Sequence, residues 1–321
     1  MDRRKFLKSG AAAAALSVVN LSCAAKEEKY QQGISRWPIC LNTGTIRPAP
    51  LQDKIKIAAE TGYDGVELWI DDLEKHEKEG GSLKELGAQI KEQGLFVPNI
   101  IGLWGCMPMD DDDFKTSLEA TKRRMRMSAD VGSGHVAAIP VPDRADFDLN
   151  IGVKRYKELL KIAREEYGII AAFEFVGFFK GIHRLGQAAA IALDADDRDA
   201  CLIMDTFHLY RGASGFNGIS LLNKDIIADF HWNDVPADPP REALSDKDRI
   251  YPGDGILPLV GVLNDLKEIG YRGPISLEMF NREHWVSDLK EVAATGREKI
   301  LALMEKAGKT RETPGKSARQ G

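Results

Sequence analysis

Cysteine is scarce in this sequence, and the four cysteines present (Cys23, Cys40, Cys106 and Cys201) are scattered along 321 residues. Once the N-terminal one is set aside, the spacing of the other three excludes both a disulfide framework and a zinc knuckle. No Gly-x-Gly-x-x-Gly motif follows the first predicted strand, which disfavours a dinucleotide-binding Rossmann fold. Beyond the N-terminal segment, no apolar run is long enough to cross a bilayer. The sequence therefore predicts a globular body without a membrane span.

Positive charge is also in short supply. The chain has 44 lysines and arginines against 49 acidic residues, a formal charge of −5. The first 23 residues carry +3, so the remainder carries −8. Binding to a phosphate backbone needs a basic footprint, so this balance argues against nucleic acid as the main ligand. Hydrophobic residues make up 43% and charged residues 29% of the chain, which is typical of a folded domain.

Residues 1–23 have the pattern of a secretory signal. The basic start RRKFLK at residues 3–8 precedes a short run rich in alanine, and it closely resembles a twin-arginine export motif. We expect export to the periplasm, with Cys23 as a candidate site for a lipid anchor. At the other end, residues 307–321 are polar and contain glycine and proline, which predicts a mobile tail.

Short apolar segments alternate with amphipathic helical patterns between Trp37 and Lys306. Eight such β-then-α units of about thirty residues each fit a closed barrel, and no linker rich in proline or serine divides them. The sequence therefore predicts an α/β fold, a single (β/α)8 TIM barrel over residues 33–306. The expected strands are Ile39–Asn42, Gly65–Trp69, Phe96–Ile101, His135–Val141, Ile169–Phe175, Ala200–Asp205, Ala228–Trp232 and Ile275–Met279.

Reactive side chains of such a barrel gather where the strands end. A polar side chain ends each of the last four predicted strands. Along the chain, neighbouring members of this set are separated by one β-then-α repeat, or by one repeat plus a long loop. Three carboxylates packed this closely repel one another unless a cation lies among them. Carboxylate oxygens and an imidazole suit one divalent ion, Mn²⁺, Mg²⁺, Co²⁺ or Zn²⁺; the alternative for each acid is a solvated or capping role. The predicted metal ligands are Glu174, Asp205, His231 and Glu278.

Several segments around these residues resemble a known family. The segments are EFVG at 174–177, MDTFH at 204–208, HWND at 231–234, DRIYPGDG at 248–255 and SLEMF at 276–280. They look like the xylose isomerase-like TIM barrel family of sugar isomerases and epimerases, with inosose (2-keto-myo-inositol) isomerase as the nearest likeness. The resemblance covers nearly the whole chain after the signal, and it implies the same four metal ligands.

The resemblance implies a reaction that moves a proton α to the carbonyl of a keto sugar or an inosose. Such a C–H bond is too weakly acidic for a side-chain base unless the carbonyl is polarised. A metal ion chelated by the carbonyl and its neighbouring hydroxyl acts as a Lewis acid and holds the enediolate. A carboxylate removes the proton and another group returns it. The resemblance implies that Glu174 and Glu278 form this catalytic pair, and we expect a metal-dependent sugar isomerase or epimerase.

Further residues near the strand ends are candidates for contact with the substrate. His208 follows Asp205 by three positions and is placed to hydrogen-bond a substrate oxygen, unless it is an ordinary residue at a helix start. Glu67 is either a substrate ligand or an outer carboxylate beside the metal ligands. Aromatic rings pack on the C–H faces of sugars. For the tryptophans the alternative role is packing under loops, and for the arginines it is that of a solvated charge. The expected substrate-binding residues are Asn42, Glu67, Trp69, Trp104, Arg241 and Arg249.

Three other functions stay open at this point. The first is a lyase that dehydrates or cleaves a keto sugar, such as a 3-keto-glycoside, on the same scaffold. The second is a periplasmic sugar-binding barrel without turnover. The third is a phosphodiester endonuclease, which would need several more histidines for its metal cluster than the six of this chain. The sequence predicts a small carbohydrate as the partner and leaves the sugar, the metal and the oligomeric state open.

Overall fold

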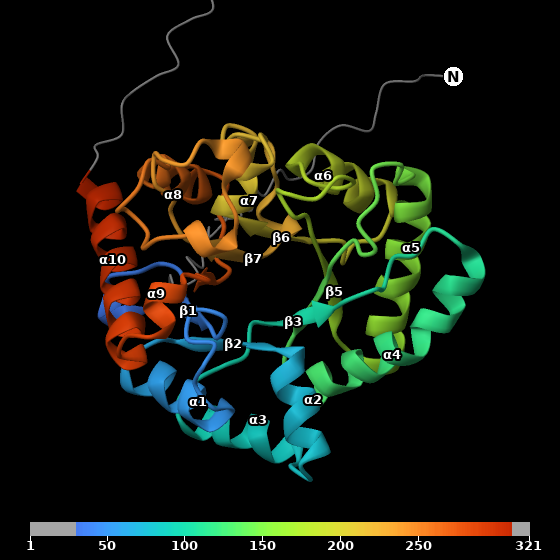
Figure 1. The fold of residues 1–321 in the computed structure, drawn as a ribbon, viewed down its shortest axis with the longest axis horizontal. Coiled ribbons are helices and arrows are strands. Elements are labelled where there is room, and N and C mark those ends of the chain that lie inside the picture. Colours follow the sequence, from blue (N-terminus) through green and yellow to red (C-terminus); the bar gives the residue numbers. More distant parts are fainter. Residues whose placement is uncertain (1–29, 310–321) are drawn as a thin grey trace, which may run out of the picture.

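The computed structural model describes residues 30–309, which form a closed barrel of eight parallel strands surrounded by helices (Figure 1). Each strand pairs with the next one along the chain, and β8 closes the barrel on β1. The strands are β1 (Ile39–Asn42), β2 (Gly65–Trp69), β3 (Asn99–Leu103), β4 (His135–Ala138), β5 (Ile170–Glu174), β6 (Leu202–Asp205), β7 (Ile227–Trp232) and β8 (Ile275–Leu277). The predicted (β/α)8 barrel is confirmed. The predicted signal segment 1–23, Cys23 included, lies outside the described residues.

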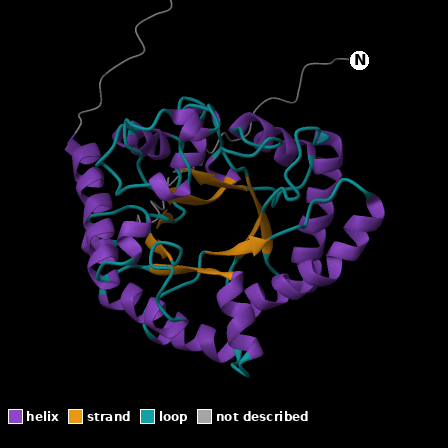
Figure 2. Cartoon of the chain, in the orientation of Figure 1, coloured by secondary structure: helices purple, strands orange, loops and turns teal. Residues whose placement is uncertain are grey.

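Helices enclose the strands on all sides of the barrel (Figure 2). They are α1 (Leu51–Glu60), α2 (Ile70–Lys78), α3 (Leu83–Glu92), α4 (Asp111–Asp130), α5 (Leu149–Ile162), α6 (Leu185–Asp194), α7 (Thr206–Arg211), α8 (Leu259–Glu268), α9 (Arg282–Trp285) and α10 (Leu289–Lys309). α10 includes residues 307–309, so the barrel ends three residues later than expected. The rest of the predicted tail, residues 310–321, lies outside the described part. Within residues 30–309, no helix has both the length and the apolar character that a membrane crossing requires.

The strands β3 to β8 differ from their expected bounds by one to three residues at one end or both, and three short helices were not expected. The third strand is expected at Phe96–Ile101 but runs from Asn99 to Leu103. Pro98 has no N–H to give to a sheet, and Phe96 makes only an isolated bridge to Gly65. The sequence pattern does not predict α2, α7 and α9, because helices of nine residues or fewer show little periodicity.

The buried side chains of the strands fall into an apolar group and a polar group. Four consecutive strands, β3 to β6, supply an apolar cluster that is separate from the main core. Its strand members include Ile101, Ala137, Ala172 and Ile203. The other four strands supply most of the buried polar side chains, among them Asn42, Glu67, His231 and Ser276, while β3, β5 and β6 add Asn99, Glu174 and Asp205. Hydrogen bonds among these polar side chains hold the residues at the mouth of the barrel in place.

One buried tyrosine ties a helix to the two strands that end at Glu174 and Asp205. Tyr156 on α5 is fully buried, and its hydroxyl accepts the N–H of Cys201 at 3.0 Å. The same hydroxyl lies 2.8 Å from the carbonyl oxygen of Cys201 and 3.0 Å from that of Ala171. Ala171 belongs to β5 and Cys201 directly precedes β6, so Tyr156 holds the two strands in register with the helix.

Tyr156→Phe is expected to lower the free energy of unfolding by about 1–3 kcal/mol, because it leaves buried backbone groups without a partner. Urea unfolding followed by circular dichroism measures the change. Tyr210→Phe, at a half-buried tyrosine on α7, is the control and is expected to change stability by less than about 0.5 kcal/mol. Equal stability of the two variants would contradict the bridging role of Tyr156.

Candidate metal and active site

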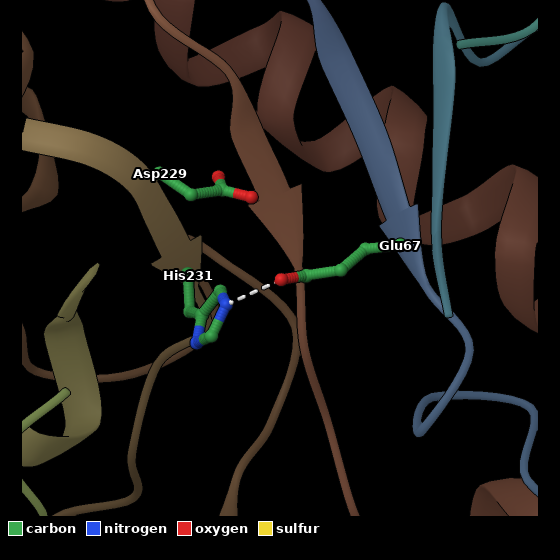
Figure 3. Close-up of side chains that lie close together, drawn as sticks. All are labelled: Glu67, Asp229 and His231. Atoms are coloured by element: carbon green, nitrogen blue, oxygen red, sulfur yellow. Dashed lines mark hydrogen bonds and ion pairs between the residues drawn. The ribbon is translucent and has the colours of Figure 1, made fainter. Parts of the chain in front are cut away.

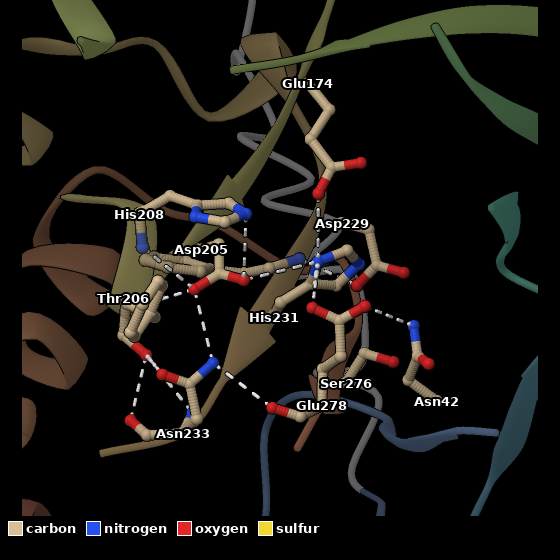
Figure 4. A network of polar contacts seen from close by, with 12 residues as sticks. Asn42, Glu174, Asp205, Thr206, His208, Asp229, His231, Asn233, Ser276 and Glu278 are labelled. Atoms are coloured by element: carbon tan, nitrogen blue, oxygen red, sulfur yellow. Dashed lines mark hydrogen bonds and ion pairs between the residues drawn. The ribbon is translucent and has the colours of Figure 1, made fainter. Parts of the chain in front are cut away.

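The residues predicted as metal ligands meet at the mouth of the barrel, at the C-terminal ends of the strands (Figure 4). Glu174 and Asp205 are the last residues of β5 and β6. His231 precedes the last residue of β7, and Glu278 directly follows β8. Asp205 pairs in register with His231, so neighbouring strands bring these side chains to the same height. The structure thus brings together the four residues that their spacing along the chain singled out.

The imidazole of His231 is the centre of this cluster. Its Nδ1 lies 3.2 Å from Glu278 Oε2, 3.4 Å from Glu174 Oε1 and 3.8 Å from Asp205 Oδ2. Nδ1 is buried and has no hydrogen-bond partner among the described residues. Ligand atoms of Asp205, His231 and Glu278 all lie within 4.8 Å of one another. A buried nitrogen that faces carboxylate oxygens fits a divalent cation both in geometry and in donor chemistry.

The electrostatics of the cluster favours positive charge at its centre. Burial disfavours a charged imidazole, yet the carboxylates of Glu278 and Glu67 outweigh it and hold the pKa of His231 well above its ordinary value. Burial raises the pKa of Glu278 to about 7. Burial acts in the same direction on Asp205, but the Arg249 guanidinium overrides it and holds the pKa of Asp205 well below its usual range. The negative potential that attracts a proton to His231 attracts a divalent cation to the same place.

Asp205 is oriented by the helix that begins after it. Its Oδ1 accepts the N–H groups of Phe207 at 2.6 Å and His208 at 3.2 Å, and so caps α7. The same oxygen accepts a hydrogen bond from Asn233 Nδ2 at 3.2 Å. These bonds fix the carboxylate and turn Oδ2 toward His231.

Glu67 lies below the cluster and holds His231 in place. It is fully buried, and its Oε1 accepts hydrogen bonds from Asn99 Nδ2 at 2.8 Å and His231 Nε2 at 3.0 Å. Its Oε2 accepts bonds from Asn42 Nδ2 and Ser276 Oγ, both at 2.7 Å. With Nε2–H given to Glu67, Nδ1 is the nitrogen left for a metal, an arrangement common for histidine ligands. The expectation that Glu67 binds substrate is therefore corrected in favour of the outer-carboxylate alternative.

Asn42 is committed to the protein in the same way. Its Nδ2 donates to Glu67 Oε2 at 2.7 Å and to Glu278 Oε1 at 3.0 Å. Its Oδ1 accepts the N–H of Gly44 at 2.9 Å and Nε1–H of Trp69 at 2.8 Å. The amide is fully buried with all its hydrogen-bonding positions filled. The expected bond from Asn42 to the substrate is therefore corrected: this residue links Glu67 to Glu278.

A second group of candidate ligands lies deeper in the barrel and consists of Glu67, Asp229 and His231 (Figure 3). Asp229 accepts the N–H of Phe230 with one oxygen, while the other has no partner among the described residues. Burial, with added repulsion from Glu67, raises the pKa of Asp229 well above its ordinary value. Because Glu67 already accepts four hydrogen bonds, one of them from His231, this group supports His231 and is a poor second metal site.

Several members of this network were not expected from the sequence. They are Asn99, Asp229, Asn233 and Ser276. Asp229 was detectable, because it lies two residues before His231 on one strand and so shares its face. Asn99 lies inside the expected third strand but not at its C-terminal end, where reactive side chains were sought, and a lone serine or asparagine carries little signal.

Arg249 lies in a different environment from the one expected. It is 1% exposed, and its Nη1 donates to Asp205 Oδ2 and Glu278 Oε2, both at 2.7 Å. Its Nε and Nη2 donate to Asp246 Oδ1 at 3.0 and 2.7 Å, and Nη2 also lies 3.4 Å from His208 Nε2. All five N–H groups of the guanidinium thus face protein acceptors. The predicted contact of Arg249 with substrate hydroxyls stays a prediction; in this structure the guanidinium is held by protein groups at the cluster.

The loop that carries Arg249 is anchored by Asp234. The two oxygens of this carboxylate accept four backbone N–H groups, at 2.8 to 3.1 Å. Asp234 also forms an antiparallel bridge with Ile250. At Gly255 a Cβ atom would lie 2.1 Å from the carbonyl oxygen of Val235, so only glycine fits there. These contacts fix the loop and place Arg249 over the cluster.

His208 lies at the cluster, whereas Arg241 does not reach it. Burial lowers the pKa of His208, so its ring is neutral near pH 7. Because Nε2 faces an N–H of Arg249, the proton belongs on Nδ1, which is buried without a partner among the described residues. Nδ1–H is therefore a buried donor without a partner in the part of the chain that the structure describes. Arg241 pairs with its neighbour Glu242 and its side chain is 39% exposed, which fits the solvated-charge alternative.

Trp69 and Trp104 form an aromatic wall beside the cluster. Their ring centroids are 6.1 Å apart with an interplanar angle of 27°, and Phe280 meets Trp69 edge-on at 5.6 Å. The hydrogen bond from Trp69 to Asn42 joins this wall to the cluster, and Trp104 is 36% exposed. An exposed indole beside a polar site suits the C–H face of a sugar, and this contact stays a prediction for both residues.

Glu67→Gln is expected to weaken metal binding by about 10- to 100-fold. The amide group replaces one of the acceptor oxygens, so two of the four donors around Glu67 are left facing another donor and the support of His231 is weakened. Isothermal titration calorimetry with Mn²⁺ measures the change. Glu92→Gln, at an exposed glutamate on α3, is the matched control with unchanged affinity. Wild-type affinity in the Glu67 variant would show that His231 is oriented without it.

The sequence profile of the family described as xylose isomerase-like TIM barrel matches residues 55–303. An inosose isomerase of Bacillus velezensis is 26% identical over 274 residues, covering 84% of this chain and 97% of that protein. A 3-dehydroshikimate dehydratase of Pseudomonas aeruginosa is 26% identical over 274 residues, covering 82% of this chain and 42% of that protein.

Solved structures share the same barrel. The crystal structure of the IolI protein with a bound zinc atom superposes with a TM-score of 0.78 at 24% identity, covering 84% of this chain and 99% of that one. The structure of an L-ribulose 3-epimerase superposes with a TM-score of 0.66 at 17% identity, covering 87% of this chain and 100% of that one. At such identities these structures speak for the fold alone. Because the family profile spans most of the barrel, we conclude that this chain belongs to the xylose isomerase-like TIM barrel family.

Proposed function

We propose that this protein is a divalent-metal-dependent isomerase or epimerase of a keto sugar or an inosose. The observation that carries the proposal is the buried, unpartnered Nδ1 of His231, which faces three carboxylates. This donor set suits one Mn²⁺, Mg²⁺, Co²⁺ or Zn²⁺ ion, held by His231 with Glu174, Asp205 and Glu278. When bound, the ion supplies Lewis-acid polarisation of a substrate carbonyl.

Glu174 and Glu278 are the proposed acid–base pair. They approach His231 from the end of β5 and from the residue after β8. One carboxylate takes the proton from the carbon next to the carbonyl, which gives an enediolate. The other returns a proton, either to the neighbouring carbon in an isomerase or to the opposite face of the same carbon in an epimerase. Nδ1–H of His208 donates to a substrate oxygen, and Trp69 and Trp104 pack on the sugar.

The relatives support this class of reaction. The matched inosose isomerase aligns over 97% of its length, and an L-ribulose 3-epimerase shares the barrel. The IolI structure, which shares the fold, contains a zinc atom. We carry the reaction class and the metal dependence over to this chain because its cluster offers an imidazole and three carboxylates as donors.

A lyase is the second candidate function. It is favoured by the match to a 3-dehydroshikimate dehydratase. The same carboxylate that removes a proton α to a carbonyl would set off the loss of a leaving group from the β carbon, so the residues need no rearrangement. A keto sugar with a hydroxyl or a sugar at that carbon, such as a 3-keto-glycoside, is the substrate this reaction would take.

Solvent exchange distinguishes the two functions. Metal-loaded protein is incubated in D₂O with a panel of keto sugars, inososes and 3-keto-glycosides, and the recovered compounds are analysed by NMR and mass spectrometry. Deuterium at a carbon next to the carbonyl of a recovered isomer supports the isomerase, whereas loss of water or of an aglycone supports the lyase. Sugar binding without any C–H exchange would leave a binding protein and overturn both.

Glu174→Gln is expected to lower kcat by about 10²–10⁴-fold, because an amide cannot take the substrate proton. The assay is run at saturating Mn²⁺, and the bound metal is quantified. A fall in turnover caused by loss of the metal is thereby distinguished from one caused by loss of the catalytic base. Glu166→Gln, at an exposed glutamate paired with Lys122, is the control with wild-type turnover. Near-normal turnover of the Glu174 variant would remove this residue from the acid–base pair.

We also propose that the protein acts in the periplasm. The proposal rests on the twin-arginine pattern at residues 3–8. A twin-arginine signal exports folded proteins, which suits an enzyme that takes up its metal before export. Replacing both arginines of this pattern by lysine should retain the protein in the cytoplasm, which fractionation followed by immunoblotting measures. Unchanged periplasmic recovery of that variant would contradict the proposal.

A further inference from the structure

The inside of the barrel is apolar beneath two of the proposed metal ligands. Ala172 and Ile203 belong to the apolar cluster that β3 to β6 supply. They lie two residues before Glu174 and Asp205 on the same strands, so their side chains share the face that points into the barrel. The site therefore has a polar side, formed around His231, and an apolar side below the ends of β5 and β6.

The apolar side continues upward to the loops around the mouth. Trp69, Val141 and Phe179 pack against the same apolar cluster and are only partly buried. Trp69 is the last residue of β2, whereas Val141 and Phe179 lie in the loops after β4 and β5. Apolar surface thus extends from the interior of the barrel to its rim.

Two exposed aromatic rings complete this side of the mouth. Trp104 directly follows β3 and is 36% exposed, and Phe178 follows the end of β5 by four residues and is 39% exposed. Phe178 meets the ring of His208 edge-on, with centroids 5.7 Å apart. We define the apolar rim as Trp69, Trp104, Val141, Phe178 and Phe179.

The loops that carry the apolar rim are tied to one another. The N–H of Met107 donates to the carbonyl oxygen of Val141 at 3.2 Å and joins the loops after β3 and β4. Asp143 Oδ1 accepts the N–H groups of Lys180 at 2.8 Å and Gly181 at 3.0 Å, and so joins the loops after β4 and β5. A ligand therefore meets rings that are already held in position, which lowers the entropy cost of binding.

We propose that the apolar rim binds an aromatic or other apolar group attached to the keto sugar, so that the substrate is a keto-glycoside with such an aglycone. The inference rests on the proposed function in one respect, the placement of the keto group at the His231 cluster. It names the class of substrate and holds for the isomerase and the lyase alike.

The arrangement of the rings favours a glycoside over a free sugar. Trp69 and Trp104 form one aromatic pair, Phe178 and Phe179 form another, and the loop after β4 lies between them along the chain. One sugar ring at the cluster packs on one pair, which leaves the other pair for an attached group. A free keto sugar or an inosose carries oxygen on nearly every carbon, and such oxygens lose hydrogen bonds to water against apolar rings. An apolar aglycone gains stability there instead.

The test uses the methyl and phenyl β-glycosides of D-glucose and of 3-keto-D-glucose, so that only the aglycone changes within each pair. Saturation-transfer NMR titrations with the two glucosides give their affinities and the protons that contact the protein, without turnover. Kinetics and deuterium exchange with the two keto compounds give KM and C–H exchange. The variants are Trp104→Ala and Phe178→Ala. Trp104→Phe keeps a ring, and Phe96→Ala removes a 40% exposed ring that precedes β3; circular dichroism checks folding.

Wild-type protein is expected to bind the phenyl glucoside about tenfold more tightly than the methyl glucoside, with the strongest saturation transfer to the phenyl protons. Each alanine variant at the apolar rim is expected to lower this ratio about three- to tenfold, because one ring is lost. The ratio of the KM values of the keto compounds is expected to shift in the same direction. Trp104→Phe and Phe96→Ala are expected to keep the wild-type ratios.

Equal affinity of wild-type protein for the two glucosides would overturn the inference. So would a preference that survives both alanine replacements at the apolar rim, or one that falls equally in Phe96→Ala. In each of these cases C–H exchange with the keto compounds would leave the proposed function standing. A phenyl preference that depends on Trp104 and Phe178, found without any C–H exchange, would support the inference and overturn the proposed function.

Discussion

The imidazole of His231 is held between one carboxylate below it and three carboxylates above it, and the rest of the site depends on this arrangement. Glu67 accepts a hydrogen bond from Nε2–H at 3.0 Å, which leaves Nδ1 as the nitrogen that faces a cation. Burying several like charges in one place is costly unless each is hydrogen-bonded and a counter-charge is near. The barrel meets this requirement with amides and a hydroxyl under Glu67, and with a buried guanidinium beside Asp205 and Glu278.

The closed barrel explains how so many polar groups can meet at one point. Parallel strands in register raise their last residues to a common height, as the pair Asp205 and His231 shows. Helices cover the outside, so a side chain that points inward exchanges water for other side chains. Glu67 illustrates the consequence, because each of its oxygens accepts two hydrogen bonds from other side chains. Such a saturated network resists distortion and keeps the ligands in position before any ion arrives.

The sequence predicted the barrel and its four central residues because both follow from regular spacing. Repeats of one strand and one helix give the fold, and polar residues at consecutive strand ends give the cluster. The roles of Asn42, Glu67 and Arg249 did not follow, because they depend on which atom each side chain reaches across the barrel. Arg249 lies eighteen residues beyond His231 in an irregular loop. No periodic pattern shows that such a loop folds back onto Asp205 and Glu278.

The distinction between isomerase and lyase does not lie in this cluster. Both reactions begin with removal of a proton next to a carbonyl, and the same carboxylates serve either one. The outcome depends on whether the β carbon of the substrate carries a group that can leave, and on whether the site accommodates that group. In this protein the wall of Trp69 and Trp104 borders the cluster, and Trp104 remains open to solvent. We expect a bulky leaving group to lie against this wall, and substitutions at Trp104 to change the choice of substrate without changing the proposed acid–base pair.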